Sequence, residues 1–277
     1  MVKKHLLPSL FLLLSSGPLL ANEAPAAKPV KMGKPVSAAH EHKAADVHAE
    51  DPNHWSYTGP KTGPQNWSRL NAANTPCSEG KEQSPVNVSG AVGQQLAPLK
   101  FSYGMSKLAI VNNGHTIQVN IDPGSWLEAL GERYELKQFH FHTPSEELIS
   151  GKQFPLVAHM VHKSEAGQLA VVAVLFKEGK EHPLLQTHWE RLPEEHGESR
   201  SYEERSFSPA GLLPGNLKYY TLTGSLTTPP CSEGVRWLIL KTPVELSSAQ
   251  LARFRREFPF NARPVQPING REILESM

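Results

Sequence analysis

Short runs that alternate apolar and polar residues, separated by proline and glycine, dominate this chain after about residue 51. Alternation places every second side chain on one face, which is the pattern of half-buried strands. The runs are rich in β-branched and aromatic residues, which favour strands over helices. They cover residues 109–121, 134–142, 155–163, 168–177, 219–226 and 235–241.

Helical periodicity is scarce by comparison. The best case is the segment 247–258, where Leu251, Phe254 and Phe258 recur at spacings of three and four residues. The chain shows no internal repeat and no second compositional block. We therefore predict one β-rich domain that covers residues 51–277.

The N-terminus predicts export. Residues 1–21 combine a basic start at Lys3 and Lys4 with an interrupted apolar run and a small-residue cleavage point after Ala21, as in a signal peptide. The apolar run is too short and too interrupted for a typical transmembrane helix, although an uncleaved N-terminal anchor stays the alternative. Residues 22–50 are rich in Ala, Pro, Lys and His without an apolar period, so we predict a disordered tail.

The tail contains His40, His42 and His48 in a polar context. A solvated linker is the preferred interpretation, and a weak metal-binding tract is the alternative. Removal of residues 1–21 leaves 26 basic and 27 acidic residues, a balance that argues against a nucleic-acid partner. We expect no membrane association after cleavage of the signal, and a homodimer is left open.

The chain has two cysteines, Cys77 and Cys231. An even count in an exported protein predicts one disulfide, with two free thiols as the alternative. The predicted signal peptide indicates a periplasmic or secreted protein.

The segment YELKQFHFHTPSEE, residues 134–147, raises the question of chemistry. In a strand, Gln138, His140 and His142 share one face, while Phe139 and Phe141 point to the other face and into the core. Two imidazoles on one face can bind a single ion, and imidazole suits Zn²⁺. Alone, the pair is also compatible with ordinary hydrogen bonding in a half-buried strand.

A third ligand is available in PLVAHMVHK, residues 155–163, which contains His159 and His162. Because the two histidines are three residues apart on a strand, their side chains point to opposite faces, and only one can join the site. The alternation of the strand alone does not show which one does. The turn-like pair Ser150 and Gly151 between the two runs makes an antiparallel pairing plausible. Three histidines with one open position form a catalytic rather than a structural zinc arrangement.

Five segments now stand together in order: NNGHT, QFHFHTPSE, AHMVH, GSLTTPPCSEGVRW and NARPVQP. Together they resemble α-class carbonic anhydrases of the bacterial secreted type, and the match runs from His54 to about Arg271. The resemblance implies a mostly β fold, built on a large, twisted, mostly antiparallel central sheet with short peripheral helices. It implies reversible hydration of CO2 to bicarbonate and a proton.

The resemblance also implies residue roles. Zinc carries the attacking hydroxide and is bound by His140, His142 and His159, while His162 is structural. Thr227 orients the hydroxide and passes a hydrogen bond to Glu146. His115 is the proton shuttle, and Gly114 beside it fits a turn or a bulge that directs its side chain. The remaining matches are the substrate-pocket residues Thr228, Val161, Val171, Leu226 and Trp237, the water-chain residues Tyr57, Asn113 and Gln118, and the disulfide Cys77–Cys231.

Hydrogen-bond partners of the ligands follow the family pattern in two cases of three. Gln138 matches the partner of His140, and the backbone near Asn261 matches the partner of His142. Val157 stands where many relatives have glutamate, and valine cannot accept a hydrogen bond from His159. The third ligand therefore bonds to water or another segment, or lacks a partner, and we predict weaker zinc retention. Glu147 stands where relatives often have histidine and receives no role.

Three other functions compete with a CO2 hydratase. An inactive binding module on the same fold would be expected to lack a zinc histidine. A zinc-buffering protein would depend on the tail at 22–50. Ester hydrolysis would need a pocket shaped for an ester, and no sequence feature indicates one.

Overall fold

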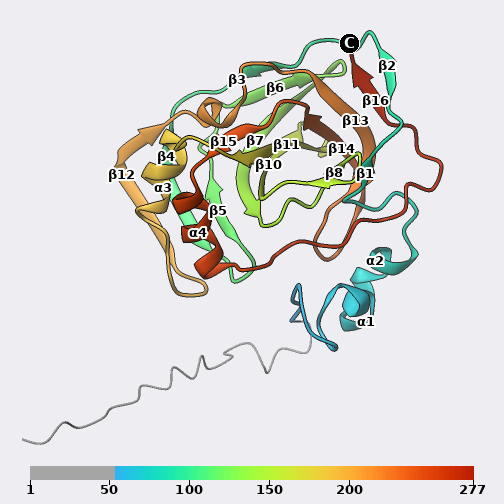
Figure 1. Cartoon of the computed structure of the whole chain (residues 1–277), viewed down its shortest axis with the longest axis horizontal. Helices are drawn as coiled ribbons and strands as arrows, with labels where there is room; N and C mark the ends of the chain where they lie inside the picture. Colours follow the sequence, from blue (N-terminus) through green and yellow to red (C-terminus); the bar gives the residue numbers. More distant parts are fainter. Residues whose placement is uncertain (1–53) are drawn as a thin grey trace, which may run out of the picture. The chain divides into compact units, whose positions relative to one another are not determined.

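The computed structural model describes residues 54–277. The predicted signal peptide (1–21) and tail (22–50) lie outside the described residues. In the described part, no helix combines the length and apolar character needed to cross a membrane. The elements, labelled in Figure 1, are η1 (Pro64–Asn66), α1 (Trp67–Leu70), η2 (Ala72–Asn74), α2 (Pro76–Glu79), β1 (Asn87–Val88), β2 (Val92–Gln94), β3 (Lys100–Ser102), β4 (Ser106–Asn112), β5 (Ile117–Asn120), β6 (Trp126–Ala129), β7 (Glu132–His142), β8 (Leu148–Ile149), β9 (Lys152–Gln153), β10 (Leu156–Ser164), β11 (Leu169–Glu178), α3 (Pro183–Trp189), β12 (Ser199–Phe207), η3 (Pro209–Leu212), β13 (Tyr219–Ser225), β14 (Glu233–Leu240), β15 (Val244–Leu246), α4 (Ser248–Glu257) and β16 (Leu274–Ser276).

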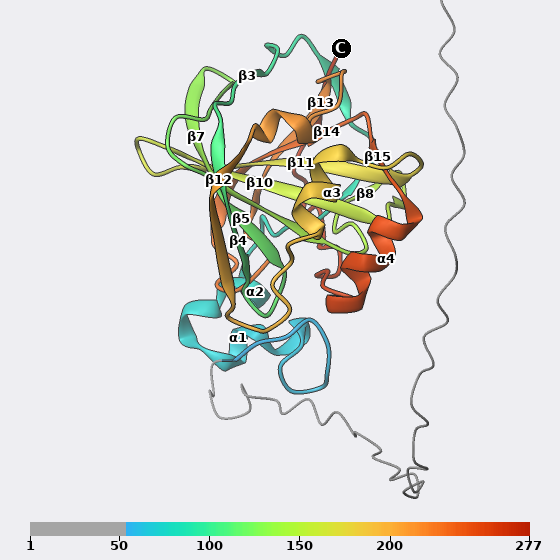
Figure 2. The same cartoon turned by 90° about the vertical axis from the view of Figure 1, so that its left-hand side faces the viewer.

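A large twisted sheet of thirteen strands forms the centre (Figures 1 and 2). Its main order is β12-β4-β5-β7-β10-β11-β14-β13-β16-β2, with β15 beside β11 and β6 between β3 and β7. The pairs β11–β14, β11–β15 and β16–β2 are parallel, and the other pairs of this sheet are antiparallel. A small sheet has the order β1-β8-β9. The predicted mostly β architecture is confirmed.

The predicted strand runs match β7, β10, β11, β13 and β14. The run 109–121 is two strands, β4 and β5, because a turn divides it. Asn113 Oδ1 accepts hydrogen bonds from the backbone N–H groups of His115 and Thr116, and Gly114 takes a φ of +83°. Glycine adopts that left-handed conformation without steric cost, so of the two alternatives at Gly114, a turn or a bulge, the turn is the one observed.

The sequence analysis predicted neither the short helices and strands outside these runs nor two larger elements, β12 and α3. Strand β12 is largely exposed and forms one edge of the sheet, so it lacks the apolar alternation that marks half-buried strands. Helix α3 is short and packs with α4 on one side of the sheet (Figure 2). The predicted helix at 247–258 is α4, which begins with a capping box between Ser247 and Gln250.

The two faces of the central strands pack against different surroundings. Phe139 and Phe141 of β7 point into the main apolar core together with Met160 of β10. The opposite face of β10 carries Val157, which belongs to a second, smaller apolar cluster, and His159. The core face holds the strands in register, so the other face presents its polar side chains in fixed positions.

His162 lies on the core side of β10 and is fully buried. The Tyr103 hydroxyl lies 2.6 Å from His162 Nε2 and hydrogen-bonds to it. Burial lowers the pKa of His162 to about 4. The side chain is therefore neutral in the folded protein near pH 7, as suits a structural group.

The predicted disulfide between Cys77 and Cys231 is confirmed. It joins positions 154 residues apart and packs with Tyr57 and Trp67 in a third apolar cluster. It therefore ties the N-terminal segment of the domain to the loop that follows β13.

Reduction of the disulfide is expected to destabilise the fold. A cross-link over so long a loop removes much chain entropy from the unfolded state, which sets an upper limit of about 5 kcal/mol. Urea unfolding of the oxidised protein and of Cys77→Ser/Cys231→Ser measures the loss of unfolding free energy. Equal unfolding free energies would contradict this role.

Acidification is expected to destabilise the fold partly through His162. The unfolded side chain takes up a proton near pH 6.5, whereas the folded one does so only near pH 4. Stability is therefore lost as pH falls from 6.5 to 4, by on the order of 3 kcal/mol for this group. Urea unfolding between pH 8 and pH 4.5 should show a shallower decline for His162→Gln than for wild type, and parallel declines would refute the assignment.

Candidate metal centre

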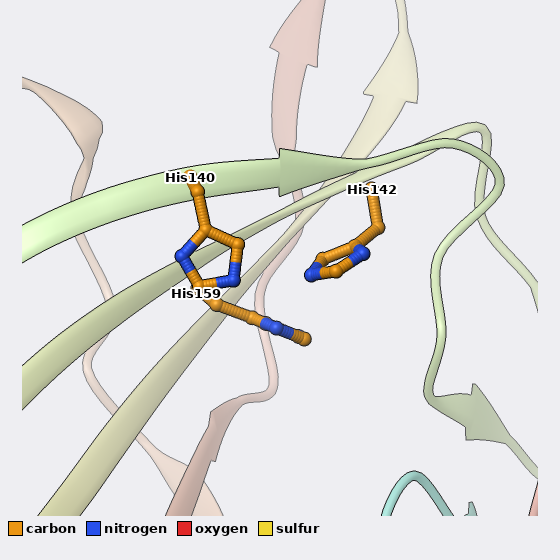
Figure 3. A group of neighbouring side chains, drawn as sticks. All are labelled: His140, His142 and His159. Carbon is orange, nitrogen blue, oxygen red and sulfur yellow. The ribbon is translucent and has the colours of Figure 1, made fainter. Parts of the chain in front are cut away.

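Strands β7 and β10 bring three imidazoles together (Figure 3). The antiparallel register places His159 directly opposite His140, and His142 follows two residues later on the same face of β7. One ring nitrogen from each histidine lies within 4.8 Å of the others. The side chain of His162 points away from this cluster. His159 is therefore its third histidine, which strand alternation alone did not establish.

Two of the three imidazoles have the predicted hydrogen-bond partners. His140 Nδ1 donates to Gln138 Oε1 over 2.9 Å. His142 Nδ1 donates to the backbone carbonyl of Asn261 over 2.8 Å. In each ring the Nε2 atom is left without a proton and is available as a ligand.

The third imidazole has a partner that was not predicted. His159 Nε2 lies 2.9 Å from Glu147 Oε1, which leaves Nδ1 as the available nitrogen. Val157 is fully buried among apolar side chains and contributes no acceptor. The notion that His159 lacks support is therefore wrong, and the predicted weak zinc retention loses its basis. Of the alternatives considered, the bond to another chain segment is the one observed.

Electrostatics keeps two of the three rings neutral and so available to a cation. Burial, followed by the charge of His159, lowers the pKa of His140 to about 3. Burial likewise lowers the pKa of His142 well below its usual value. Burial opposes protonation of His159 too, but Glu147 and Glu146 outweigh it and raise the pKa of His159.

The donor set fits zinc. Among the described residues, His142 Nε2 is buried and has no hydrogen-bond partner, a costly state that a metal ion relieves. Three imidazole nitrogens with one open position are the ligands of a catalytic Zn²⁺ site. Each ring also has the outer partner that normally fixes the orientation of a ligating histidine.

Glu146 lies directly beside the imidazoles. Its side chain is buried, and Oε2 lies 3.5 Å from His142 Nε2 and 3.8 Å from His159 Nδ1. Its other oxygen, Oε1, accepts the backbone N–H of Arg263 over 2.7 Å. The Thr227 side chain is close enough to lower the pKa of this carboxylate. The structure thus brings the predicted partners Glu146 and Thr227 near each other.

The pKa of Glu146 is raised to about 7. Burial is the main cause, and the charge of Glu147 adds to it. His159, the Arg263 N–H and Thr227 act in the opposite direction.

Arg263 is a site-supporting residue that the sequence analysis missed. Its guanidinium is buried, lies over the Trp67 ring and donates to the backbone carbonyls of Cys77 and Ser84 and to Gln83 Oε1. It connects the disulfide region with Glu146. Its position in the NARPVQP segment was the available signal.

A cavity of about 130 Å³ opens beside His140 and His142. The proposed proton shuttle and the water-chain residues line it together, although they come from separate segments. Its lining comprises Trp55, Tyr57, Asn113, His115, Thr116, Gln118, Gln138, His140, His142 and Thr228. His115 stacks on Trp55, with ring centroids 3.7 Å apart and planes 8° from parallel. The sequence analysis assigned no role to Trp55.

The four apolar residues of the expected substrate pocket also meet. Val171 and Trp237 are buried in the second apolar cluster, and Val161 and Leu226 pack against it. The Trp237 ring centroid lies 5.0 Å from that of His159. An apolar wall therefore adjoins the third imidazole.

Comparisons with known proteins agree with this geometry. Residues 62–277 match the family model for eukaryotic-type carbonic anhydrase. A carbonic anhydrase of Pectobacterium carotovorum is 44% identical over 227 residues, which cover 82% of this chain and 92% of that protein. One of Neisseria gonorrhoeae is 46% identical, covering 80% and 88%.

A solved structure gives the same result. A hyperthermostable carbonic anhydrase from an active hydrothermal vent chimney superposes with a TM-score of 0.78 at 48% identity, covering 81% of this chain and all of that one. Fold, histidine cluster and relatives agree, and the chain therefore belongs to the eukaryotic-type, or α-class, carbonic anhydrase family.

Proposed function

We propose that this carbonic anhydrase uses zinc, bound by His140, His142 and His159, for the reversible hydration of CO2 to bicarbonate and a proton. The observation that carries the proposal is the arrangement of the three imidazoles. Each has one nitrogen engaged by a protein partner, and one ring nitrogen from each lies within 4.8 Å of the others. Bound zinc supplies the nucleophile by lowering the pKa of a water ligand, an effect of which carbonic anhydrase is the standard example.

Thr227 and Glu146 orient the nucleophile. In this arrangement the Thr227 hydroxyl donates its single proton to the nearby Glu146 carboxylate, whose pKa it lowers. The Thr227 oxygen can then only accept from the reacting O–H group. This arrangement directs a lone pair of the nucleophile toward the substrate, while the Thr227 N–H faces a substrate oxygen. Thr228 is the neighbouring polar residue of this pocket.

The apolar wall holds CO2. Carbon dioxide is apolar, so a surface of Val161, Val171, Leu226 and Trp237 binds it without loss of hydrogen bonds to water. Bicarbonate is charged and gains nothing from this surface. The wall therefore favours entry of CO2 and release of the product.

His115 moves the proton. A histidine side chain titrates near neutral pH, so it can accept a proton from water and release it to buffer. It shares the cavity with Tyr57, Asn113 and Gln118, whose polar groups can order a water chain toward the zinc ligands. Stacking on Trp55 gives the ring a defined resting position at the cavity wall.

We also propose a periplasmic or secreted location. A structural disulfide persists in oxidising compartments and is rare in the cytosol. The disulfide supports this location independently of the predicted signal peptide at residues 1–21.

The purified protein is expected to hold one zinc ion per chain and to hydrate CO2. His142→Ala removes one of the three proposed zinc ligands and should abolish both zinc binding and activity. Deletion of residues 22–50 should preserve both. Metal analysis and stopped-flow hydration measure the two properties, and loss of most zinc with the tail would favour the zinc-buffering alternative.

Replacement of the shuttle is expected to slow turnover in weak buffer. His115→Ala should lower the hydration rate by about 100-fold, the lower end of what a positioned proton-transfer group contributes. A small imidazole buffer should restore most of the rate, because it replaces the missing group. The exposed His196→Ala variant is the matched control. Full activity of His115→Ala in weak buffer would reject the shuttle.

A further inference from the structure

Glu147 is a buried carboxylate that takes no part in the reaction steps proposed above. Its side chain is 1% exposed, and Oε1 lies 2.9 Å from His159 Nε2. Among the described residues, Oε2 of Glu147 has no hydrogen-bond partner. In residues 54–277, Glu146 and Glu147 are the carboxylates buried in this way. The proposed function already assigns Glu146 to the orienting pair with Thr227.

A buried charge is costly unless it is paired and hydrogen-bonded. For Glu147 the observed side-chain partner is the N–H at His159 Nε2. This bond decides the tautomer, because a proton on Nε2 leaves Nδ1 bare. Nδ1 is also the atom that faces the centre, 3.8 Å from Glu146 Oε2. Glu147 thus determines which nitrogen His159 presents.

The backbone that carries Glu147 is firmly held. Ser145 Oγ donates to the Glu147 carbonyl over 2.8 Å and accepts the N–H of Phe154 over 2.9 Å. The next residue, Leu148, begins β8 and donates its N–H to the carbonyl of Val86. The carboxylate is therefore positioned before any metal arrives, which is what a ligand-orienting group needs.

Strand β10 offers His159 no acceptor of its own. Val157 shares the face of His159 but is apolar and fully buried. We propose that Glu147 is the positioning residue of the third zinc ligand, holding His159 as an Nδ1 donor and slowing zinc loss from a segment outside β10. This inference rests on the zinc site proposed above. It replaces the predicted weak retention with firm retention.

The rate of zinc transfer to excess dipicolinate tests the inference without reference to activity. Glu147→Ala is expected to lose zinc about 10–100-fold faster, the usual effect of removing such a partner. The double variant Glu147→Ala/Val157→Glu moves the carboxylate to β10 and should recover most of this change. Val157→Glu alone should not slow zinc loss, because the single N–H of His159 is already bonded.

A loosened strand could also release zinc, so the control is Met160→Ala. Met160 adjoins His159 on β10 but points into the main core. This variant should be less stable to urea and yet release zinc at close to the wild-type rate. Faster release from Met160→Ala than from Glu147→Ala would overturn the positioning role.

Other results would also overturn the inference. A wild-type rate for Glu147→Ala contradicts the role of the carboxylate, and a double variant no better than the single one contradicts its transfer to β10. If Glu147→Ala does not fold, Glu147→Gln preserves the shape and should still release zinc faster than wild type, because a neutral amide is the weaker acceptor. A rate of zinc release from Glu147→Gln equal to that of the wild type would count against the proposal.

A wild-type protein that binds no zinc would instead overturn the proposed function.

Discussion

The antiparallel pairing of β7 with β10 is the interaction on which the site depends. It sets His159 opposite His140, and the alternation of the strand brings His142 to the same face. Phe139 and Phe141 on the reverse face are buried in the main core. A slip of one residue would bury the imidazoles in that core and expose the phenylalanines, so apolar packing specifies the geometry of the ligands.

The same centre concentrates ionisable groups that are expensive to bury. Its three imidazoles are accompanied by the carboxylates of Glu146 and Glu147, and most of their polar atoms have partners. The exceptions, His142 Nε2 and one oxygen of each carboxylate, lie where no described side chain completes them. A divalent cation would balance the two carboxylates and could bind the unprotonated nitrogens. The zinc proposed above would thus offset the cost of burial.

Sequence periodicity predicted the strands that carry the site, because these strands are half buried and their alternation is visible. It missed β12, whose exposed edge position leaves no apolar pattern. The residues alone left the choice between His159 and His162 open, since that choice depends on register. Resemblance supplied the roles of Glu146, Thr227 and His115. Contacts between distant segments, such as that of Arg263 with Cys77, follow from packing and have no local signature.

Glu147 shows why position in the sequence is an incomplete guide to a hydrogen-bond partner. A ligating imidazole needs an acceptor at a given point in space, and either a strand neighbour or a nearby loop can supply it. Supplied from β10, the acceptor would move with its ligand. Supplied by Glu147, it depends on the Ser145 bonds and on the small sheet of β1, β8 and β9. The third ligand is thereby linked to a second structural unit, and disturbance of that sheet reaches the metal centre through one hydrogen bond.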